Sequence, residues 1–330
     1  MMSTIKDVAR ESGLSVGTVS RVLNGRGYLS QEAKDRVQAA MHRLGYEPNA
    51  LARSLSKSTS RIVAIIMPML DNPFFSELLM AITGELSQRG YQSLLFVCDS
   101  PEGNVSLFIR ECMRNRVAGI ILCSGALTSA DLGELAIPVV TLERGSLENA
   151  SRIKCDNRLG GRLAAEHLIA RGCVRLLALS APQGRPMPGD ERLEAFIETC
   201  RQAGVECIGE VLEPGLFHSQ DYTASLEEVL SRHQDRDGLF CTSDILALQA
   251  MGVACKLARR IPEDLKVVGF DGTKLARTLR PSLTTVAQPT GQMARLAVES
   301  VIEAAKPSSV RVDMTVEVRL VEGDSTMASV

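Results

Sequence analysis

Histidine and cysteine, the side chains most often used for acid–base, nucleophilic or metal chemistry, are scattered through this chain of 330 residues. Its histidines (His42, His167, His218 and His233) have no partner at a spacing typical of a catalytic or metal site. The nine cysteines form no C-x-x-C pair, which favours reduced thiols in a cytoplasmic protein. No G-x-G-x-x-G, G-x-x-x-x-G-K-[ST] or H-E-x-x-H motif occurs. The sequence therefore predicts no catalytic site, no metal and no cofactor, and an α/β enzyme with an unrecognised site stays open as an alternative.

A different chemistry is indicated near the N-terminus, where hydroxyl and guanidinium side chains are grouped. A first helix is expected from a capping box of Thr4 and Asp7 to Gly13, and Ser15 caps a second helix that reaches Asn24. Two short helices joined by a glycine-containing turn are typical of a helix-turn-helix, whose second helix enters the DNA major groove. Hydroxyls suit phosphate oxygens, and arginine suits a guanine edge or a phosphate. The side chains at the start of the second helix are Ser15, Val16, Gly17, Thr18, Ser20 and Arg21.

A third amphipathic helix, capped by Ser30, is expected from Gln31 to about Leu44. Residues 1–60 contain nine basic and five acidic side chains, a net charge of +4, whereas the other 270 residues contain 28 and 34, a net charge of −6. A compact basic arm on an acidic body is typical of nucleic-acid binding. A three-helix bundle that contacts other proteins is the alternative.

Three stretches, residues 5–9, 13–24 and 44–55, closely resemble the LacI/GalR (lactose/galactose repressor) family. The match is dense over the first 57 residues, and Leu14, where the family more often has valine, is a mild departure. The resemblance implies a repressor that binds double-stranded operator DNA. The candidate DNA-binding residues are Thr4, Ser15, Val16, Gly17, Thr18, Ser20, Arg21, Asn24, Ser30, Tyr46, Asn49, Ala52, Arg53 and Leu55.

The segment after Pro48 is expected to form a hinge helix over Asn49 to Leu55. Seven residues are too few for a stable free helix, so we expect this segment to fold on DNA. The resemblance implies that the paired hinge helices lie in the minor groove and that Leu55 wedges between base pairs. The alternative for Leu55 is packing on the body.

Beyond Ser60, apolar strand-like runs alternate with amphipathic stretches of helical length. This alternation predicts parallel sheets with helices on both faces, and the number of units predicts two lobes. The runs are residues 62–67, 93–98, 119–123, 139–142, 176–179, 238–241 and 267–270. The fold class is therefore a small all-α helix-turn-helix domain plus an α/β body of two parallel sheets, which resembles the periplasmic sugar-binding proteins.

That resemblance implies three crossings between the lobes, which we expect near Asp156, Thr285–Gln288 and Thr315. The predicted organisation is a helix-turn-helix domain (1–47), a hinge helix and linker (48–60) and a body (61–330) that binds effector and dimerises. Its first lobe covers about 61–156 and 288–314, and its second about 157–287 and 315–330. Gly160 and Gly161 follow the first crossing and are interpreted as part of the inter-lobe hinge.

Polar and aromatic residues follow several predicted strands, at the edge where ligands bind in open α/β sheets. With no tryptophan in the chain, phenylalanine must supply any apolar platform for a sugar ring. Matched positions in the family contact effector, and the candidates carried over are Asp71, Phe74, Phe75, Arg144, Arg192, Ser243, Asp244, Asp271 and Gln288. Ser243 departs from the family's usual asparagine. The alternative for each is a helix cap or an inter-lobe ion pair, above all for Asp244.

The sequence therefore predicts a DNA-binding repressor, acting as a homodimer on a palindromic operator and switched by a small molecule between the lobes. Residues 269–274 and 283–289 look most like sucrose- or ribose-operon repressors, which favours a sugar or sugar phosphate. A corepressor-type regulator that responds to a purine or other metabolite is the alternative. No apolar run is long enough for a membrane helix, so no membrane partner is expected. A periplasmic sugar-binding protein is excluded, because such a protein would not need the DNA-binding residues 1–57.

Overall fold

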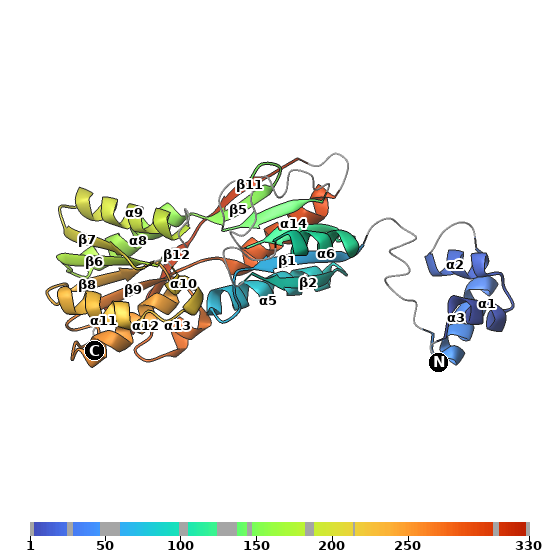
Figure 1. The fold of residues 1–330 in the computed structure, drawn as a ribbon, viewed down its shortest axis with the longest axis horizontal. Helices are drawn as coiled ribbons and strands as arrows, with labels where there is room; N and C mark the ends of the chain where they lie inside the picture. The colour runs from blue at the N-terminus through green and yellow to red at the C-terminus, as the bar shows by residue number, and fades with distance from the viewer. Residues whose placement is uncertain are drawn as a thin grey trace. The chain divides into compact units, whose positions relative to one another are not determined.

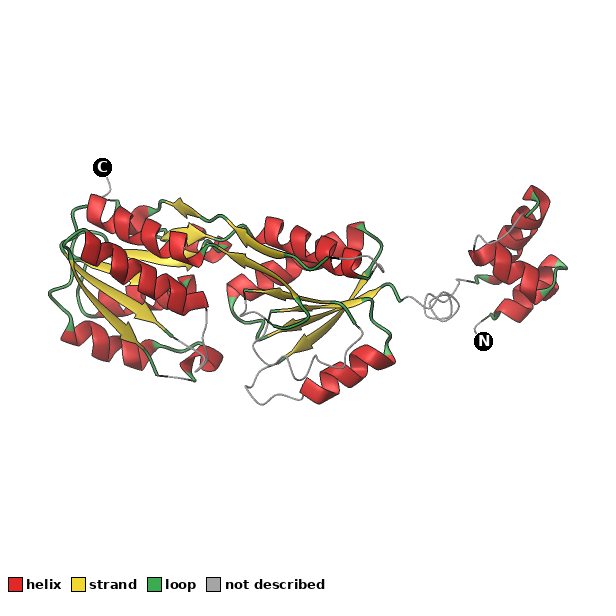
Figure 2. Cartoon of the chain, turned by 90° about the horizontal axis from the view of Figure 1, so that it is seen from above, coloured by secondary structure: helices red, strands yellow, loops and turns green. Residues whose placement is uncertain are grey.

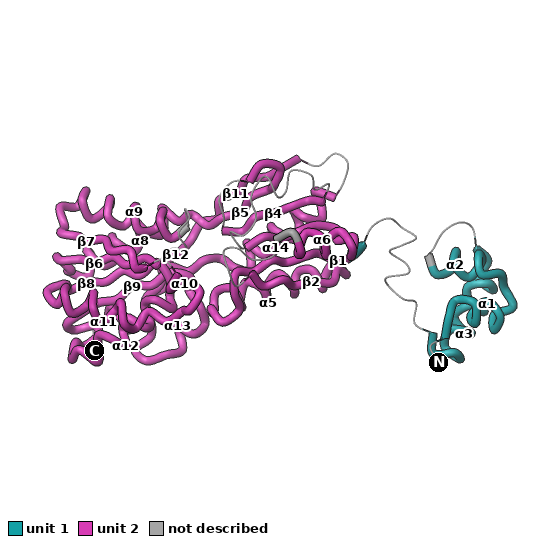
Figure 3. The backbone as a smooth tube through the Cα atoms, in the orientation of Figure 1, with its two compact units in different colours: residues 1–61 teal, residues 62–330 magenta. Residues whose placement is uncertain are grey.

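The computed structural model describes residues 3–24, 29–46, 60–98, 105–123, 137–143, 147–181, 188–213, 215–305 and 310–327. The chain divides into two compact units, residues 1–61 and 62–330, which are coloured separately in Figure 3. Each unit has a hydrophobic core of its own. The predicted hinge helix, including Asn49, Ala52, Arg53 and Leu55, lies outside the described residues.

The first unit contains three helices, α1 (Ile5–Ser12), α2 (Val16–Asn24) and α3 (Gln31–Leu44). The Asp7 carboxylate accepts hydrogen bonds from Thr4 N and Thr4 Oγ1, at 2.9 and 2.7 Å, which lowers the pKa of Asp7. Gly13 has φ 65° and ends α1, because glycine enters the left-handed region at no steric cost. The buried core contains Val8, Ala9, Val19, Val37 and Ala40. The three predicted helices are therefore confirmed.

The second unit contains two six-stranded sheets with helices on both faces, arranged as two lobes (Figures 1 and 2). The N-lobe sheet has the order β11-β5-β4-β3-β1-β2, and all its neighbouring strands are parallel. Its strands are β1 (Ile62–Met67), β2 (Gln92–Val97), β3 (Gly119–Leu122), β4 (Val139–Leu142), β5 (Ser151–Cys155) and β11 (Asp313–Val316).

Alternate residues of β1 explain how the N-lobe helices are distributed. Val63 and Ile65 pack with α5 (Pro73–Gln88) and α14 (Thr290–Ala304), whereas Ala64 and Ile66 pack with α6 (Val105–Arg114). Successive side chains of a strand point to opposite faces, so α5 and α14 cover one face and α6 the other. This arrangement explains why β1 is one continuous apolar run in the sequence.

The C-lobe sheet has the order β12-β10-β9-β8-β6-β7, with β12 antiparallel to β10. Leu176 and Ala178 face one core, and Leu177 and Leu179 face the other. The strands are β6 (Arg175–Ser180), β7 (Glu206–Val211), β8 (Gly238–Cys241), β9 (Lys266–Asp271), β10 (Thr284–Ala287) and β12 (Arg319–Val321). Its helices are α8 (Asn157–Ala170), α9 (Pro188–Gln202), α10 (Leu216–Ser219), α11 (Thr223–Arg232), α12 (Asp244–Lys256) and α13 (Lys274–Thr278), followed by a 3₁₀ turn at Asp324–Thr326.

The chain changes sheet three times, after Cys155, after Ala287 and between Val316 and Arg319. The third change lies just after Thr315, near which it was predicted, and the lobe boundary that was expected at about residues 314–315 falls after Val316. Thr315 lies inside β11, because that strand pairs with β5 up to the register Val316–Cys155. The crossing therefore falls about two residues later than predicted.

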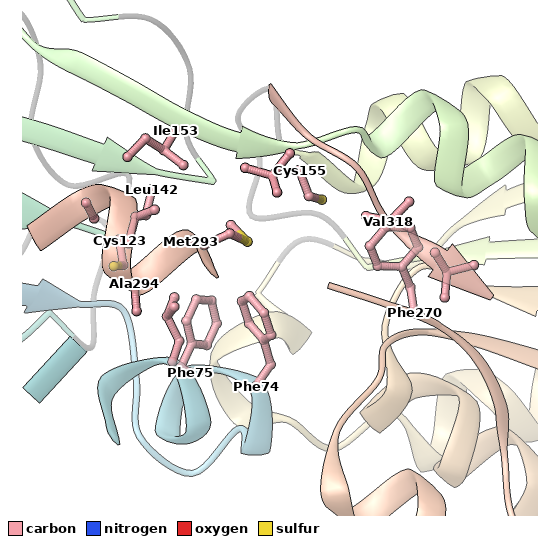
Figure 4. Close-up of a cluster of buried hydrophobic side chains, with 14 of the residues drawn as sticks. Phe74, Phe75, Cys123, Leu142, Ile153, Cys155, Phe270, Met293, Ala294 and Val318 are labelled. Atoms are coloured by element: carbon pink, nitrogen blue, oxygen red, sulfur yellow. The ribbon is translucent and has the colours of Figure 1, made fainter. Parts of the chain in front are cut away.

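One hydrophobic cluster continues through the crossing region from lobe to lobe. Figure 4 shows Phe74 and Phe75 on the first turn of α5, Met293 above them, and Phe270 and Val318 on the C-lobe side. Gly160 and Gly161 belong to this packing, because both lie within α8. A Cβ atom on Gly160 would lie 2.4 Å from the Phe270 ring, and one on Gly161 would lie 2.2 Å from the Arg192 carbonyl oxygen. The hinge interpretation of these glycines is thus wrong, since they allow α8 to pack closely.

Candidate functional site

The first turn of α2 exposes the side chains that the sequence assigned to base recognition. Ser15 Oγ accepts a hydrogen bond from Thr18 N at 3.1 Å and caps the helix. Val16 is 42% exposed although it is apolar, and Gly17 and Arg21 are exposed beside it. Val19 is fully buried on the opposite face and anchors α2 in the core. The exposed face is therefore held rigidly and is available for contact with another molecule.

Residues 13–17 also have the G-x-S-x-G spacing of a hydrolase nucleophile turn, which needs a strand before it and a helix after it. Here the segment joins α1 to α2, and the Ser15 hydroxyl lies 2.9 Å from Thr18 Oγ1. The helix-turn-helix geometry therefore gives Ser15 no nucleophile role.

The remaining predicted DNA-binding residues lie around this helix bundle. Thr18 and Ser20 are half-buried on α2, and Ser30 caps α3 through Ala33 N at 3.3 Å. Tyr46 packs against the helical core. Asn24 ends α2, but its side chain lies outside the described part of the structure.

A second candidate site is a cavity at the carboxyl ends of the strands, with walls from both lobes. It encloses about 660 Å³, counted out to its open mouth. The described lining residues are Asn72, Phe74, Phe75, Glu143, Ser180, Ala181, Gly189, Arg192, Phe217, Tyr222, Thr242, Ser243 and Asp271. A concave site at the strand ends of two parallel sheets is where α/β proteins bind small ligands.

Arg192, near the start of α9, is the centre of the polar wall. Its Nη2 lies 3.3 Å from Glu143 Oε2 of the N-lobe, and its Nη1 lies 3.5 Å from Asp271 Oδ1 of the C-lobe. Further hydrogen bonds run from Nε to Asn157 Oδ1 at 2.7 Å and from Nη1 to the Thr242 carbonyl oxygen at 2.8 Å. All three charged side chains are about 6–7% exposed, so Arg192 is a buried ionic bridge between the lobes.

The Phe270 ring supports this guanidinium from below, with the Arg192 Cζ 3.7 Å from the ring centroid. Such cation–π stacking fixes the plane of the guanidinium and so the direction of its donors. Gly160 leaves room for Phe270, because a Cβ atom at this position would collide with the ring. Five parts of the chain thus determine the position of one arginine: α8, α9, β9 and the ends of β4 and β8.

Burial strongly raises the pKa of Asp271, the second carboxylate of the bridge, to about 8, although the Arg192 charge acts in the opposite direction. The neighbouring Asp244 adds to this effect, and burial raises the pKa of Asp244 itself to about 6. At neutral pH the Asp271 carboxyl therefore holds its proton for much of the time and can donate as well as accept a hydrogen bond.

Two cleft residues have a backbone conformation that non-glycine residues rarely adopt. Glu143 follows β4 with φ 51°, and Asp271 ends β9 with φ 118°. Glu143 is held by hydrogen bonds from Cys155 N and from Asn157 Nδ2, the latter at 3.3 Å. Strained conformations persist where surrounding contacts over-determine them, and they gather at binding sites. Their occurrence on both carboxylates favours this cavity as the functional site of the body.

Aromatic side chains line another part of the same cavity. Phe74 and Phe75 have ring centroids 5.2 Å apart, and Phe75 is 6.4 Å from Phe217 of the C-lobe. Tyr222 is buried beside them, its hydroxyl 3.1 Å from Gln220 Nε2, and burial raises its pKa. One apolar face and one hydrogen-bonding face together suit the two faces of a sugar ring.

Five of the nine predicted effector residues come together here: Phe74, Phe75, Arg192, Ser243 and Asp271. Gln288 stands behind Asp271, with Nε2 2.8 Å from Asp271 Oδ1, and its buried Oε1 has no hydrogen-bond partner among the described residues. Asp244 is buried away from the cavity, where it accepts hydrogen bonds from Thr273 and Thr285. Asp71 is exposed and is not part of the cavity lining, and Arg144 lies outside the described residues.

The remaining lining residues were not predicted as effector contacts. Asn72, Glu143 and Thr242 belong to strand-end segments that the sequence did single out, so their position after a strand was the available signal. Phe217 and Tyr222 lie between β7 and α11, where no predicted strand ends. Asn72 also joins the lobes, because its Nδ2 donates to Gln220 Oε1 at 2.9 Å.

Replacing Gly160 by alanine should weaken ligand binding at this cavity without unfolding the helical first unit. The added Cβ would displace the Phe270 ring that stacks on Arg192, since it would lie 2.4 Å from that ring. We expect about 1–3 kcal/mol of destabilisation, as overpacking usually costs. Thermal unfolding measures this loss, with Gly252→Ala on α12 as the control, because no heavy atom lies within 4 Å of a Cβ there. Equal unfolding temperatures for the two variants would contradict the packing role of Gly160.

Among the described residues, no helix is long and apolar enough to cross a membrane. No group of three or more histidine, cysteine or acidic side chains in the same residues could hold a metal ion.

Comparison with known proteins relates both units to the same class of regulators. Residues 4–49 match the description "Bacterial regulatory proteins, lacI family", and residues 165–326 match "Periplasmic binding protein-like domain". The chain is 37% identical to the ribose operon repressor of Halalkalibacterium halodurans, over 87% of this chain and 86% of the relative. It is 30% identical to the sucrose operon repressor of Streptococcus mutans, over 98% of this chain and 100% of the relative.

Solved structures agree with these relatives. A periplasmic binding protein/LacI transcriptional regulator from Alkaliphilus metalliredigens, complexed with D-xylulofuranose, superposes with a TM-score of 0.73 at 28% identity, over 82% of this chain and 100% of that one. The lac repressor dimer bound to operator superposes with a TM-score of 0.85 over 99% of this chain and 100% of that one. Because the identity is only 23%, this second match shows a similarity of fold alone.

Proposed function

Because this chain belongs to the lacI family of bacterial regulatory proteins, it is a DNA-binding transcriptional repressor, and we propose that a sugar in the inter-lobe cavity switches its affinity for operator DNA. Its ribose and sucrose operon relatives and the D-xylulofuranose complex support a sugar as the ligand. A purine is the competing ligand class, and it serves as a separate arm of the test below.

The buried bridge Glu143–Arg192–Asp271 is the observation that carries this proposal. It connects the two lobes directly at the cavity, so a ligand that bonds to these side chains also acts on the contact between the lobes. Hydroxyl groups suit this site, because they can donate to the carboxylates and accept from Arg192. The aromatic side chains of the same lining offer an apolar surface for one face of a sugar ring.

Further inter-lobe contacts surround the cavity and would transmit a change in lobe position. Glu77 Oε1 of α5 accepts a hydrogen bond from Lys274 N at the start of α13, at 2.8 Å. Lys154 of β5 pairs with Glu191 of α9 at 3.1 Å. A ligand shifts the lobes only by as much as it binds one arrangement better than the other. A coupling of about 1–3 kcal/mol, about 5- to 150-fold in operator affinity, is enough to switch transcription.

We further propose that two copies bind one palindromic operator. Residues 1–60 carry a net charge of only +4, which neutralises few phosphates. A two-fold symmetric pair places two recognition helices in successive major grooves and doubles these contacts. Binding should accordingly weaken steeply as salt is added.

The test of the ligand proposal is thermal unfolding of the full chain with D-ribose, D-xylulose, sucrose and cellobiose, and separately with hypoxanthine and guanine. A ligand at 100 times its Kd stabilises the native state by about 2.7 kcal/mol, which is a readily measured shift. Stabilisation by a sugar supports the proposal. Stabilisation by a purine and by none of the sugars would replace it with the purine alternative.

The recognition surface has its own prediction. Exchanging the side chains at positions 16 and 17 (Val16→Gly with Gly17→Val) should change operator preference while leaving the unfolding temperature nearly unchanged, because both residues are exposed on α2. Each altered base contact is worth about 1–3 kcal/mol. Binding to a randomised operator pool measures the preference. Selection of the same sequences by parent and variant would show that α2 does not read bases.

A further inference from the structure

Among the described residues that line the effector cleft, the one cation is already paired with carboxylates of the protein. Arg192 is the only basic side chain among these described lining residues, and Glu143 and Asp271 are the acidic ones. Glu143 alone balances the Arg192 charge. When Asp271 is ionised, it adds one negative charge. The described lining residues therefore have a net charge between zero and −1, depending on whether Asp271 is ionised.

The donors of Arg192 are nearly all in use as well. A guanidinium has five N–H groups. Asn157 Oδ1, the Thr242 carbonyl, Asp271 Oδ1 and Glu143 Oε2 accept from four of them, at 2.7, 2.8, 3.5 and 3.3 Å. When the contacts of the described residues are counted, one N–H, on Nη2, is left for a ligand. A phosphate group is usually bound by arginine through two parallel N–H groups, and here that would require displacing a carboxylate.

The other polar groups of the lining mainly accept hydrogen bonds or belong to hydroxyls. Glu143 and Asp271 contribute carboxyl oxygens, and Thr242 Oγ1 lies 3.3 Å from Ser180 Oγ. A sugar hydroxyl can donate to such oxygens, whereas a phosphate dianion has only acceptors and meets like charge. Because Glu143 and Asp271 are about 6% exposed, water cannot screen that repulsion effectively.

From these contacts we propose that the cleft selects an uncharged, polyhydroxylated ligand against its phosphate monoester, and that Glu143 sets this selectivity. The inference rests on the proposed function, and it narrows the expected ligand from a sugar or sugar phosphate to the free sugar. Glu143 acts directly, as the N-lobe carboxylate that neutralises Arg192 and faces the cavity. Asp271 adds a second negative charge from the C-lobe only when it ionises, since burial raises its pKa to about 8.

The test is isothermal titration of the full chain, at neutral pH and fixed ionic strength, with matched pairs of probes. The pairs are D-ribose and D-ribose 5-phosphate, D-xylulose and D-xylulose 5-phosphate, and sucrose and sucrose 6-phosphate. In each pair that binds, we expect the free sugar to bind about a hundredfold tighter or more, since burying an unbalanced like charge costs several kcal/mol. Equal or tighter binding of the phosphate ester would overturn the inference while leaving the proposed function intact.

Two variants test the role of Glu143. Glu143→Gln keeps the size of the side chain and an acceptor oxygen but removes the charge, so Arg192 is released for an anion. We expect the preference for the free sugar to fall by about tenfold or more. Glu228→Gln removes the same charge from the exposed face of α11 and should leave the preference unchanged. An unchanged preference in Glu143→Gln would show that Glu143 does not set it.

The possible failures can be told apart. If Glu143→Gln does not fold, which circular dichroism would show, Asp271→Asn is compared with the parent at pH 9, where the parent Asp271 is ionised because its raised pKa is about 8. A preference for the free sugar that is unchanged in this variant at pH 9 would contradict the electrostatic argument. If neither member of any pair binds the parent protein, the proposed sugar effector is wrong and this inference is wrong with it.

Discussion

Replacing Arg192 by alanine should abolish the response to sugar while leaving the operator affinity of the sugar-free protein within about threefold of the parent. The variant loses the Arg192 N–H group that remains for a ligand once the described protein acceptors are counted, and it leaves Glu143 and Asp271 buried without their shared cation. Removing one member of a buried ion pair typically costs about 3–5 kcal/mol. Protonation of Asp271 relieves part of that cost, because burial already raises its pKa to about 8.

The matched control for this variant is Arg158→Ala on α8. Arg158 also pairs with two carboxylates, Glu194 and Glu198, at 3.4 and 2.6 Å, but its side chain is 52% exposed. Exposed pairs contribute at most about 1 kcal/mol, so this control should keep both the sugar response and most of the stability. Titration of each variant with sugar and with operator DNA measures the difference. A normal sugar response in Arg192→Ala would remove this arginine from the effector site.

Replacing Asp271 by asparagine should stabilise the sugar-free protein progressively as the pH rises from about 4 to about 8. Over this range the native state retains the Asp271 proton, since burial raises its pKa to about 8, whereas the unfolded chain has lost it. The parent therefore loses free energy of unfolding as the pH rises through this window. Asparagine cannot ionise, so we expect an advantage that is near zero at pH 4 and on the order of 2 kcal/mol or more at pH 8.

Two other groups define the controls for this pH profile. The pKa of Asp244 is raised to about 6 by burial, so its ionisation lowers the free energy of unfolding of both proteins over the lower part of this pH range. Asp313, by contrast, is an exposed carboxylate whose pKa is lowered by its hydrogen bonds with Arg152. Asp313→Asn should therefore give no advantage that grows with pH. Parallel stability profiles for the parent and Asp271→Asn between pH 4 and pH 8 would show that Asp271 is ionised in the native cleft.

The buried strands were the part of the fold most open to prediction. β1 and β8 are apolar throughout because both of their faces are covered, and their predicted limits agree with the structure. β7 (Glu206–Val211) was missed because it is an edge strand in which Glu206, Gly209 and Glu210 interrupt the apolar pattern. β5 (Ser151–Cys155) was missed for a related reason, since Ser151, Arg152 and Lys154 interrupt its apolar pattern.

The cleft could be predicted only in part, because its members come from distant segments whose meeting depends on both lobes. Position after a strand identified the segments that contain Asn72, Glu143 and Thr242, and resemblance to the family identified Arg192 and Asp271. Neither signal could reveal that Glu143 and Asp271 share one arginine, since residues 143 and 271 belong to different sheets. For Asp244 the same signal was misleading. Its place after a strand suggested a ligand contact, but its carboxylate accepts hydrogen bonds from the buried hydroxyls of Thr273 and Thr285.

The most direct test of the account is the affinity of the full chain for its operator, measured by fluorescence anisotropy with and without saturating free sugar. The operator is first selected from a random pool, and the sugar is the one that stabilises the protein against unfolding. We expect the sugar to change the operator affinity by at least about fivefold. We expect this change to disappear in Arg192→Ala and to persist in Arg158→Ala. An operator affinity that stays constant while the sugar demonstrably binds would contradict the claim that the inter-lobe cleft controls DNA binding.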